Sequence, residues 1–220
     1  DPDDQALLAH VQNHGFRDAP KPLGFDEQGR EIVSFLEGKA AQYPLPDWIW
    51  NDRVLTDIAT LQRRYHDSTM HFRPPIDAVW QWLVHEPFEV ICHNDFAPYN
   101  IIFSHDDQLA SSILISFSRL TRLGPGYTAY RFVPLTAPGN PDTPLSSAAE
   151  QLRRVSLFCT AYGDVDPASL LQTAVQRLSE LIDFIVTSAA AGNAAQQHVL
   201  ARGDVDIYTA DRSYIREQLI

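Results

Sequence analysis

The chain has 220 residues, of which 45% are hydrophobic and 20% are charged, a composition that excludes a disordered chain and favours one compact body. Its formal net charge of -11, from 17 Lys plus Arg against 28 Asp plus Glu, repels phosphate backbones, so nucleic acid is not an expected partner. The same field attracts cations, although most acidic proteins bind no cationic ligand.

The cysteines and the apolar runs indicate the compartment. Cys92 and Cys159 lie in apolar stretches, without the spacing of a disulfide framework or a zinc site. No apolar run approaches the ~20 residues of a membrane span. Three of the first four residues are acidic, whereas a secretory signal begins with basic residues. We therefore expect a cytoplasmic protein with no membrane partner.

The first third of the chain is predicted to form two helices with a hairpin between them. Residues 4–14 have apolar side chains at helical spacing and end at Gly15, which suits the left-handed position after a helix. Residues 23–36 read as two strands joined by a turn at 27–30. The pattern over 52–67 is that of an amphipathic helix.

The middle of the chain is predicted to be less regular. We expect a helix over 75–85, a strand over 88–92 and a small hairpin made by 101–103 and 113–115. Residues 116–145 contain five of the fifteen prolines and little periodicity, which predicts an unusually long loop.

The last third is predicted to be helical. Residues 146–162 begin with two serines, either of which can cap a helix, and residues 166–192 begin with an Asp-Pro pair typical of a helix start. A final helix is expected over about 206–218. The predicted fold class is therefore α+β and mostly helical.

One motif carries chemistry. The sequence HNDFAPYN, from His93 to Asn100, is a polar loop between two buried strands. Phosphoryl transfer uses a carboxylate that accepts or orients the proton of the substrate hydroxyl, and an amide oxygen a few residues later that holds a metal. Asp95 and Asn100 have that separation. The alternative is a polar hairpin connection that contains these residue types by chance.

The pattern H-x-D-x-x-x-x-N resembles the catalytic loop of the aminoglycoside phosphotransferase and choline kinase families, which are similar to protein kinases. The resemblance implies that Asp95 is the catalytic base and that Asn100 binds magnesium. It implies that His93 is a scaffold residue of the catalytic loop.

Other segments carry the same resemblance. Residues 29–38 resemble the last strand of the small lobe and the hinge, where backbone groups near Phe35 and Leu36 would contact the adenine of ATP. Weaker similarity extends over 61–66, 130–135 and 203–214. The resemblance implies a kinase-like large lobe.

That large C-terminal lobe would span residues 39–220 and carry the motif. Residues 1–38 would be a remnant of the small N-terminal lobe with the hinge. If the strands that usually complete this lobe are absent, an open sheet edge remains, and such edges tend to pair. We therefore expect a homodimer or a partner chain on the hairpin.

The sequence departs from the family at the metal position. The family has an Ile-Asp-Phe triplet whose aspartate holds the magnesium ions, whereas this chain has Ser116 in the triplet 115–117. A serine hydroxyl brings no charge, and Mg²⁺ sites depend on one or two carboxylates. Residues 108–141 contain no Asp or Glu but do contain arginines, of which Arg119 or Arg122 could replace the metal beside Asp95.

Two further family features are not found ahead of the helix expected at 4–14: a phosphate-covering loop and a basic residue that pairs with the phosphates. Two hypotheses follow. In the first, the protein keeps a small-molecule cleft but is catalytically impaired. In the second, it is an active phosphotransferase that uses ATP and magnesium on a small hydroxylated substrate, a cationic one included.

Overall fold

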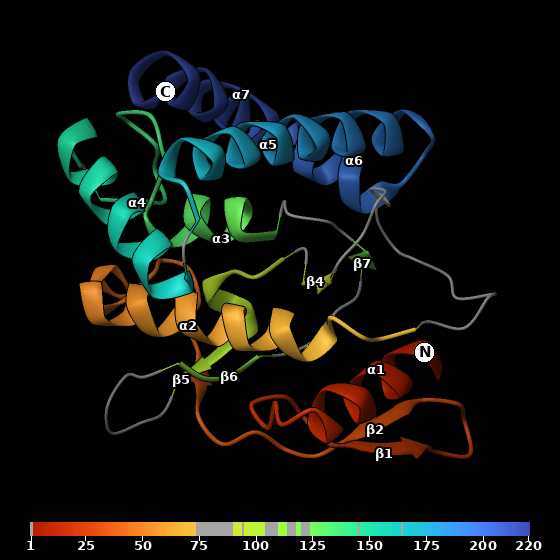
Figure 1. Cartoon of the computed structure of the whole chain (residues 1–220). Coiled ribbons are helices and arrows are strands. Elements are labelled where there is room, and N and C mark those ends of the chain that lie inside the picture. The colour runs from red at the N-terminus through yellow and green to blue at the C-terminus, as the bar shows by residue number, and fades with distance from the viewer. Residues whose placement is uncertain are drawn as a thin grey trace.

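A computed structural model describes residues 2–73, 90–93, 95–103, 110–113, 118–119, 124–144, 146–163 and 165–220. Most of these residues are helical and the strands are short, so the predicted α+β, mostly helical class is confirmed. In Figure 1 the N-terminal helix and hairpin lie at one end of the molecule, and the helices α5 (Pro167–Ala190), α6 (Ala194–Ala201) and α7 (Asp204–Tyr214) lie at the other. The predicted lobe boundary at residue 38 stays a prediction.

The N-terminal end contains helix α1 (Pro2–Asn13) and a two-stranded antiparallel sheet. Gly15 has a φ of 87°, the left-handed conformation expected after the helix. Strands β1 (Pro22–Phe25) and β2 (Glu31–Val33) form the predicted hairpin. Its turn is held by Asp26, whose side chain accepts hydrogen bonds from the backbone amides of residues 28 and 30.

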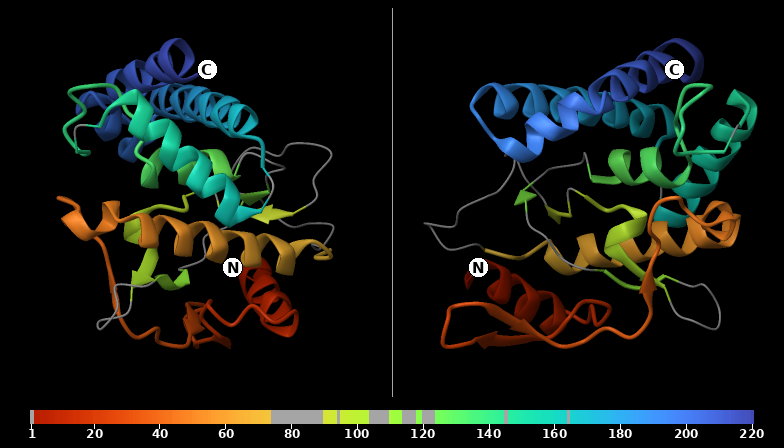
Figure 2. Two further views of the ribbon diagram at one scale, coloured as in Figure 1. Left: turned by 60° about the vertical axis from the view of Figure 1, so that its left-hand side comes forward. Right: turned by 180° about the vertical axis from the view of Figure 1, so that it is seen from behind.

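Helix α2 (Asp52–Thr69) confirms the helix predicted over 52–67. It crosses the middle of the molecule and packs against α1 and α4 (Ala148–Tyr162). It starts at Asn51, whose side chain accepts a hydrogen bond from the amide of Arg53 at 3.2 Å, a normal N-cap. Figure 2 shows α2 between the N-terminal hairpin and the C-terminal helices in both views. Its position lets it support the site loop described below.

Two small antiparallel sheets carry the site loop. Strands β3 (Lys39–Ala40), β5 (Ile101–Phe103) and β6 (Ala110–Ile113) form one sheet, and β4 (Ile91–Cys92) pairs with β7 (Ser118–Arg119) in the other. The strand before the motif and the hairpin after it are therefore found as predicted, but the second strand of the hairpin starts at Ala110 and not at residue 113. The helix predicted over 75–85 lies outside the described residues.

The prediction of a continuous loop over 116–145 was wrong. Helix α3 (Gly124–Phe132) lies within it and packs on helix α5. Its proline, Pro125, is in the first turn, where it costs no hydrogen bond. A Cβ on Gly126 would lie 2.6 Å from the backbone nitrogen of Ala174. The glycine therefore allows a close helix contact, and this packing outweighs the weak local signal for a helix.

The C-terminal third is helical, as predicted. Helix α4 (Ala148–Tyr162) is capped by the side chain of Ser147, and α5 (Pro167–Ala190) is capped by Asp166. The expected last helix is α7 (Asp204–Tyr214), which continues as one π-helical turn over Ile215–Leu219.

A short helix, α6 (Ala194–Ala201), was not predicted. It has no buried residue, so it lacks the apolar periodicity that reveals longer helices. The described part of the chain contains no helix that is both long and apolar enough to cross a membrane.

Candidate functional site

The motif loop is anchored by buried side chains. Phe96 and Ala97 are fully buried, and Pro98 begins a single 3-10 turn, Pro98–Asn100, that leads directly into β5. The amide of Asn100 closes this turn on the carbonyl of Ala97 at 2.9 Å. The loop therefore has a fixed backbone, and its polar side chains are held in place.

Asp95 and Asn100 lie in direct contact. Asn100 Nδ2 donates to the backbone carbonyl of Asp95 at 2.8 Å and to Asp95 Oδ2 at 2.9 Å. The other carboxylate oxygen, Oδ1, accepts the hydroxyl proton of Tyr99 at 2.7 Å. The structure thus brings together the two residues that the motif singled out, and adds a tyrosine that the sequence analysis did not.

His93 holds the start of the loop. Its side chain is 1% exposed, and its Nδ1 accepts the amide proton of Asp95 at 3.2 Å. The ring also meets Phe96 edge to face, with centroids 5.8 Å apart. These contacts fix the direction in which the chain enters Asp95.

A cavity of about 650 Å³ adjoins this loop. Its walls come from the segment after β3, from α3 and the loop after it, and from α7. Tyr99 belongs to both the motif loop and the cavity wall. The lining residues are Tyr43, Trp50, Tyr99, Tyr130, Arg131, Thr136, Asn140, Pro141, Asp142, Thr143, Arg202, Asp204, Ile207 and Tyr208.

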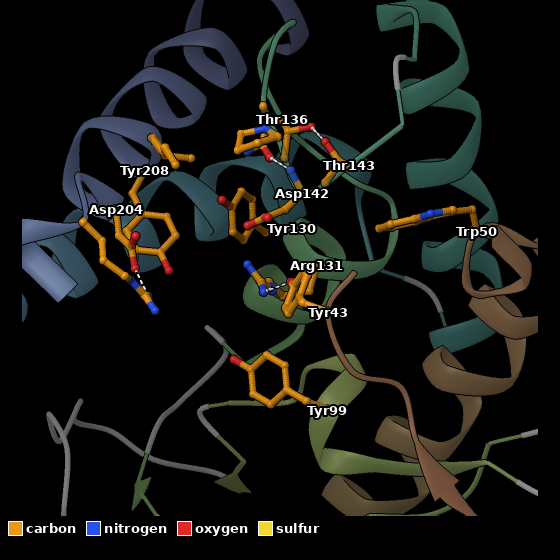
Figure 3. Close-up of a pocket in the computed structure, with 14 residues that line it drawn as sticks. Tyr43, Trp50, Tyr99, Tyr130, Arg131, Thr136, Asp142, Thr143, Asp204 and Tyr208 are labelled. Atoms are coloured by element: carbon orange, nitrogen blue, oxygen red, sulfur yellow. Dashed lines mark hydrogen bonds and ion pairs between the residues drawn. The ribbon is translucent and has the colours of Figure 1, made fainter. Parts of the chain in front are cut away.

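Arg131 and Tyr43 stand in the middle of this cavity. In Figure 3 they lie between Tyr99 on one side and Tyr130 on the other, while Tyr208 and Asp204 come from α7. The guanidinium carbon of Arg131 is 5.5 to 6.0 Å from the centroids of four tyrosine rings, those of Tyr43, Tyr99, Tyr127 and Tyr130. Nη2 of Arg131 also donates to the Tyr43 hydroxyl.

Burial raises the pKa values of these tyrosines. Desolvation is the largest cause for Tyr43, Tyr99 and Tyr130, and neighbouring carboxylates add to it, Asp95 in the case of Tyr99. The phenols therefore keep their protons at neutral pH and act as hydrogen-bond donors. For Tyr99, this keeps the donor in place on Asp95.

Asp211 on α7 shapes the outer wall of the cavity. The residue is 1% exposed, and its carboxylate accepts three hydrogen bonds, from the Tyr130 hydroxyl, the Ala137 amide and Asn140 Nδ2, at 2.7 to 2.9 Å. Burial raises the pKa of Asp211, and the three donors act in the opposite direction. One side chain thus ties α3, α7 and the loop over 136–143 together.

Phe35 and Leu36, where backbone groups are expected to contact adenine, lie outside the cavity. The side chain of Phe35 is 88% exposed and that of Leu36 is partly exposed. Neither of them lines the cavity. Their role in nucleotide binding stays a prediction.

The residues expected at the metal position are not described. Ser116 and Arg122 lie outside the described residues, as does the side chain of Arg119. Within the part that the structure describes, no group of three or more His, Cys, Asp or Glu side chains could hold a metal. Asn100 offers one amide oxygen, and both carboxylate oxygens of Asp95 already accept hydrogen bonds. A hard cation usually takes one or two carboxylates, and within the motif loop Asp95 is the one residue that could supply a carboxylate.

The tyrosines of the cavity were not among the site residues predicted from the sequence. Tyr130 and Tyr208 lie in segments that carry the family resemblance, and Tyr99 lies inside the motif. Their positions in the motif and in these segments were the sequence feature that could have identified them. Periodicity could not reveal it, because the rings come from four separate segments.

Two solved structures share the fold of this chain. The amicoumacin kinase hAmiN, solved with AMP-PNP, Ca²⁺ and amicoumacin, superposes with a TM-score of 0.61 at 12% identity, over 99% of this chain and 78% of that chain. A "putative aminoglycoside phosphotransferase" from Ralstonia eutropha gives 0.61 at 13% identity, over 98% and 84%. The chain therefore has the fold of the aminoglycoside phosphotransferases, which confirms the expected kinase-like fold.

Sequence comparison adds one curated relative. The trifolitoxin immunity protein of Rhizobium leguminosarum bv. trifolii is 38% identical over 103 residues, which are 44% of this chain. The match spans 38% of that relative's length. No family model matches the chain.

Proposed function

We propose that this chain, which has the fold of the aminoglycoside phosphotransferases, binds a small organic molecule in the tyrosine-lined cavity beside Asp95, and that its magnesium-dependent phosphoryl transfer is impaired. The observation that carries the proposal is the position of Tyr99. Its ring lines the cavity and its hydroxyl hydrogen-bonds Asp95. A ligand in the cavity would therefore lie next to the motif carboxylate.

The occupied carboxylate supports impairment. Phosphoryl transfer depends on positioning and on cations that stabilise the phosphates. Asp95 Oδ1 already accepts a hydrogen bond from Tyr99, and the sequence has Ser116 where the family has a metal-binding aspartate. Each of these features weakens a different part of the chemistry, namely access of a substrate hydroxyl to the base and metal binding.

The second candidate is an active phosphotransferase that uses ATP and magnesium. The direct contact between Asp95 and Asn100 favours it, because it keeps the two motif residues together. In this case Asp95 would accept the proton of the substrate hydroxyl, Asn100 would contribute an oxygen to the metal, and His93 would hold the loop. The hinge near Phe35 would contact adenine.

The immunity protein suggests a biological setting. Its name describes protection against trifolitoxin. For this chain we propose protection against a toxic organic compound, by sequestration in the cavity. Expression of the chain in a sensitive host would then raise the inhibitory concentration of the compound, and a variant with a filled cavity, Ile207→Trp, would not.

The N-terminal hairpin supports a proposal on assembly. Leu23, Phe25, Ile32 and Val33 are 39% to 59% exposed on its two strands, an apolar surface that often pairs. We propose self-association through this surface, in a cytoplasmic protein. Sedimentation of a strict monomer at high concentration would contradict the self-association.

The main proposal is tested by ligand binding and turnover on the same samples. A panel of hydroxylated aromatic compounds and amines is titrated into the chain and into Ile207→Trp, and ATP consumption with magnesium is followed in parallel. We expect binding that the tryptophan weakens, without turnover. Ligand binding unaffected by Ile207→Trp would place the ligand elsewhere and overturn the proposal.

A further inference from the structure

Arg131 is a cation that faces the cavity without a carboxylate partner. It forms no ion pair with any residue in the described ranges, and its one polar contact there is the Nη2 bond to the hydroxyl of Tyr43. Its Nε is buried and has no hydrogen-bond partner among the described atoms. A guanidinium has five donors in a planar fork, so most of its hydrogen-bonding capacity is unused.

The carboxylates around Arg131 are engaged elsewhere or lie at the rim. Asp211 accepts three hydrogen bonds from other groups, and Asp95 accepts from Tyr99 and Asn100. Asp204 forms an ion pair with Arg202. Asp142 is exposed on the loop after α3. Arg131 therefore has four tyrosine rings around it and no ion-pair partner among the described residues, although its charge also acts on Asp211.

Those rings define the shape of the space around the cation. Arg131 lies over four tyrosine rings, and the rings of Tyr43 and Tyr99 are 6.2 Å apart. Tyr208 and Trp50 extend the aromatic lining on opposite sides of the cavity (Figure 3). Aromatic side chains favour flat rings in offset or edge-to-face contact. The partly buried cation, whose Nε is buried, favours an anion, because a charge removed from water needs a partner.

We propose that the ligand of this cavity carries an oxyanion, a carboxylate or a phosphate, that pairs with Arg131, and a flat ring that packs among the tyrosines. The inference rests on the proposed function, since it names the chemical class bound at the same site. Arginine recognises both oxyanions through paired, charge-assisted hydrogen bonds. Although the net charge is -11, the cavity lining has two arginines, Arg131 and Arg202, for its two carboxylates, Asp142 and Asp204, and distant surface charges are screened over ~8 Å in physiological salt.

Three probes with the same ring test this inference on the full chain. They are 2-naphthoate, 2-naphthyl phosphate and the neutral 2-naphthamide, and dissociation constants are measured by calorimetry or by protein NMR. We expect at least one of the anions to bind about tenfold more tightly than the amide, the gain of one good charge-assisted pair. The tighter anion identifies the oxyanion as carboxylate or phosphate.

Variants assign the preference to Arg131. Arg131→Gln should remove the preference for the anion while the amide keeps its affinity within about twofold, and Arg131→Lys should keep part of the preference. The matched control is Arg30→Gln, which removes an ion-paired arginine outside the cavity, on the N-terminal hairpin, and it should leave the preference unchanged. Tyr208→Ala should weaken all three probes, since it removes part of the lining.

The outcomes separate the two proposals. Equal affinity for the anions and the amide, or a preference that persists in Arg131→Gln, would overturn the oxyanion inference and leave small-molecule binding in place. Binding of none of the three probes would overturn both. If Arg131→Gln does not fold, the comparison of probes on the unmodified chain and on Arg131→Lys still decides.

Discussion

The hydroxyl of Tyr99 donates a 2.7 Å hydrogen bond to Asp95 Oδ1. The tyrosine hydroxyl thus uses one of the two carboxylate oxygens that a substrate hydroxyl would need if Asp95 were a general base. Its raised pKa keeps it protonated at neutral pH. The motif carboxylate is thus already supplied with a hydroxyl from its own loop.

Removal of that hydroxyl should be costly. We predict that Tyr99→Phe lowers the free energy of unfolding by about 2 kcal/mol, because the bond goes to a charged acceptor in a partly buried site. The matched control is Tyr214→Phe, which removes a 2.9 Å bond to the neutral oxygen of Gln151 and should cost about 1 kcal/mol. Urea unfolding measures both. Equal losses would show that the carboxylate adds nothing to the bond.

Asp211 should be required for the cavity wall. We predict that Asp211→Asn lowers the free energy of unfolding by about 3 kcal/mol. The substitution replaces one of the two carboxylate oxygens, which together accept three hydrogen bonds, by an NH₂ group that cannot accept any. The loop over 136–143 should loosen, and ligand affinity should fall. The same substitution at the exposed Asp206 on the same helix is the control, with a loss of a few tenths. A stable Asp211→Asn with unchanged ligand affinity would contradict this role.

The stability of the fold should fall on acidification through His66. This residue is 3% exposed, and its Nδ1 contacts the Tyr162 hydroxyl at 2.6 Å. Burial, with Arg63 and His93 adding to it, lowers the pKa of His66 to about 3 from 6.5. The unfolded chain therefore takes up a proton that the folded chain excludes.

The sign follows from that difference. The stabilising contribution of neutral His66 is complete above pH 6.5 and is lost as the pH falls toward 3, by up to about 1.4 kcal/mol per pH unit. His66→Gln should lose stability less steeply over this interval, and His198→Gln, at an exposed position, should follow the parent. Denaturant unfolding between pH 7 and pH 4 provides the test. Parallel curves for the parent and His66→Gln would contradict it.

Elements with strong end signals could be predicted from the sequence. Ser147 and Asp166 cap the helices that their positions indicated, and Gly15 ends α1. Helix α3 could not be predicted, because its nine residues include two glycines and a proline and its stability comes from contact with α5. Local helix propensity does not predict a helix whose stability comes from tertiary packing.

The residues of the candidate site likewise include some that could be predicted from the sequence and some that could not. Asp95 and Asn100 could be predicted to lie together because they are five positions apart in one short loop. The tyrosines around Arg131 could not, since Tyr43 lies 88 residues from Arg131 in the sequence. Only the fold brings such segments together.

In the proposed function, the cavity binds its ligand while magnesium-dependent phosphoryl transfer is impaired. The most direct measurement follows loss of the γ-phosphate of ATP with magnesium, over a panel of hydroxylated compounds, for the chain as it stands and for Asp95→Asn and Ser116→Asp. We predict that the unmodified chain does not exceed the Asp95→Asn background, because Ser116 stands where the family has a metal-binding aspartate and Tyr99 hydrogen-bonds Asp95. Robust turnover by the unmodified chain that Asp95→Asn abolishes would contradict the account and establish an active phosphotransferase.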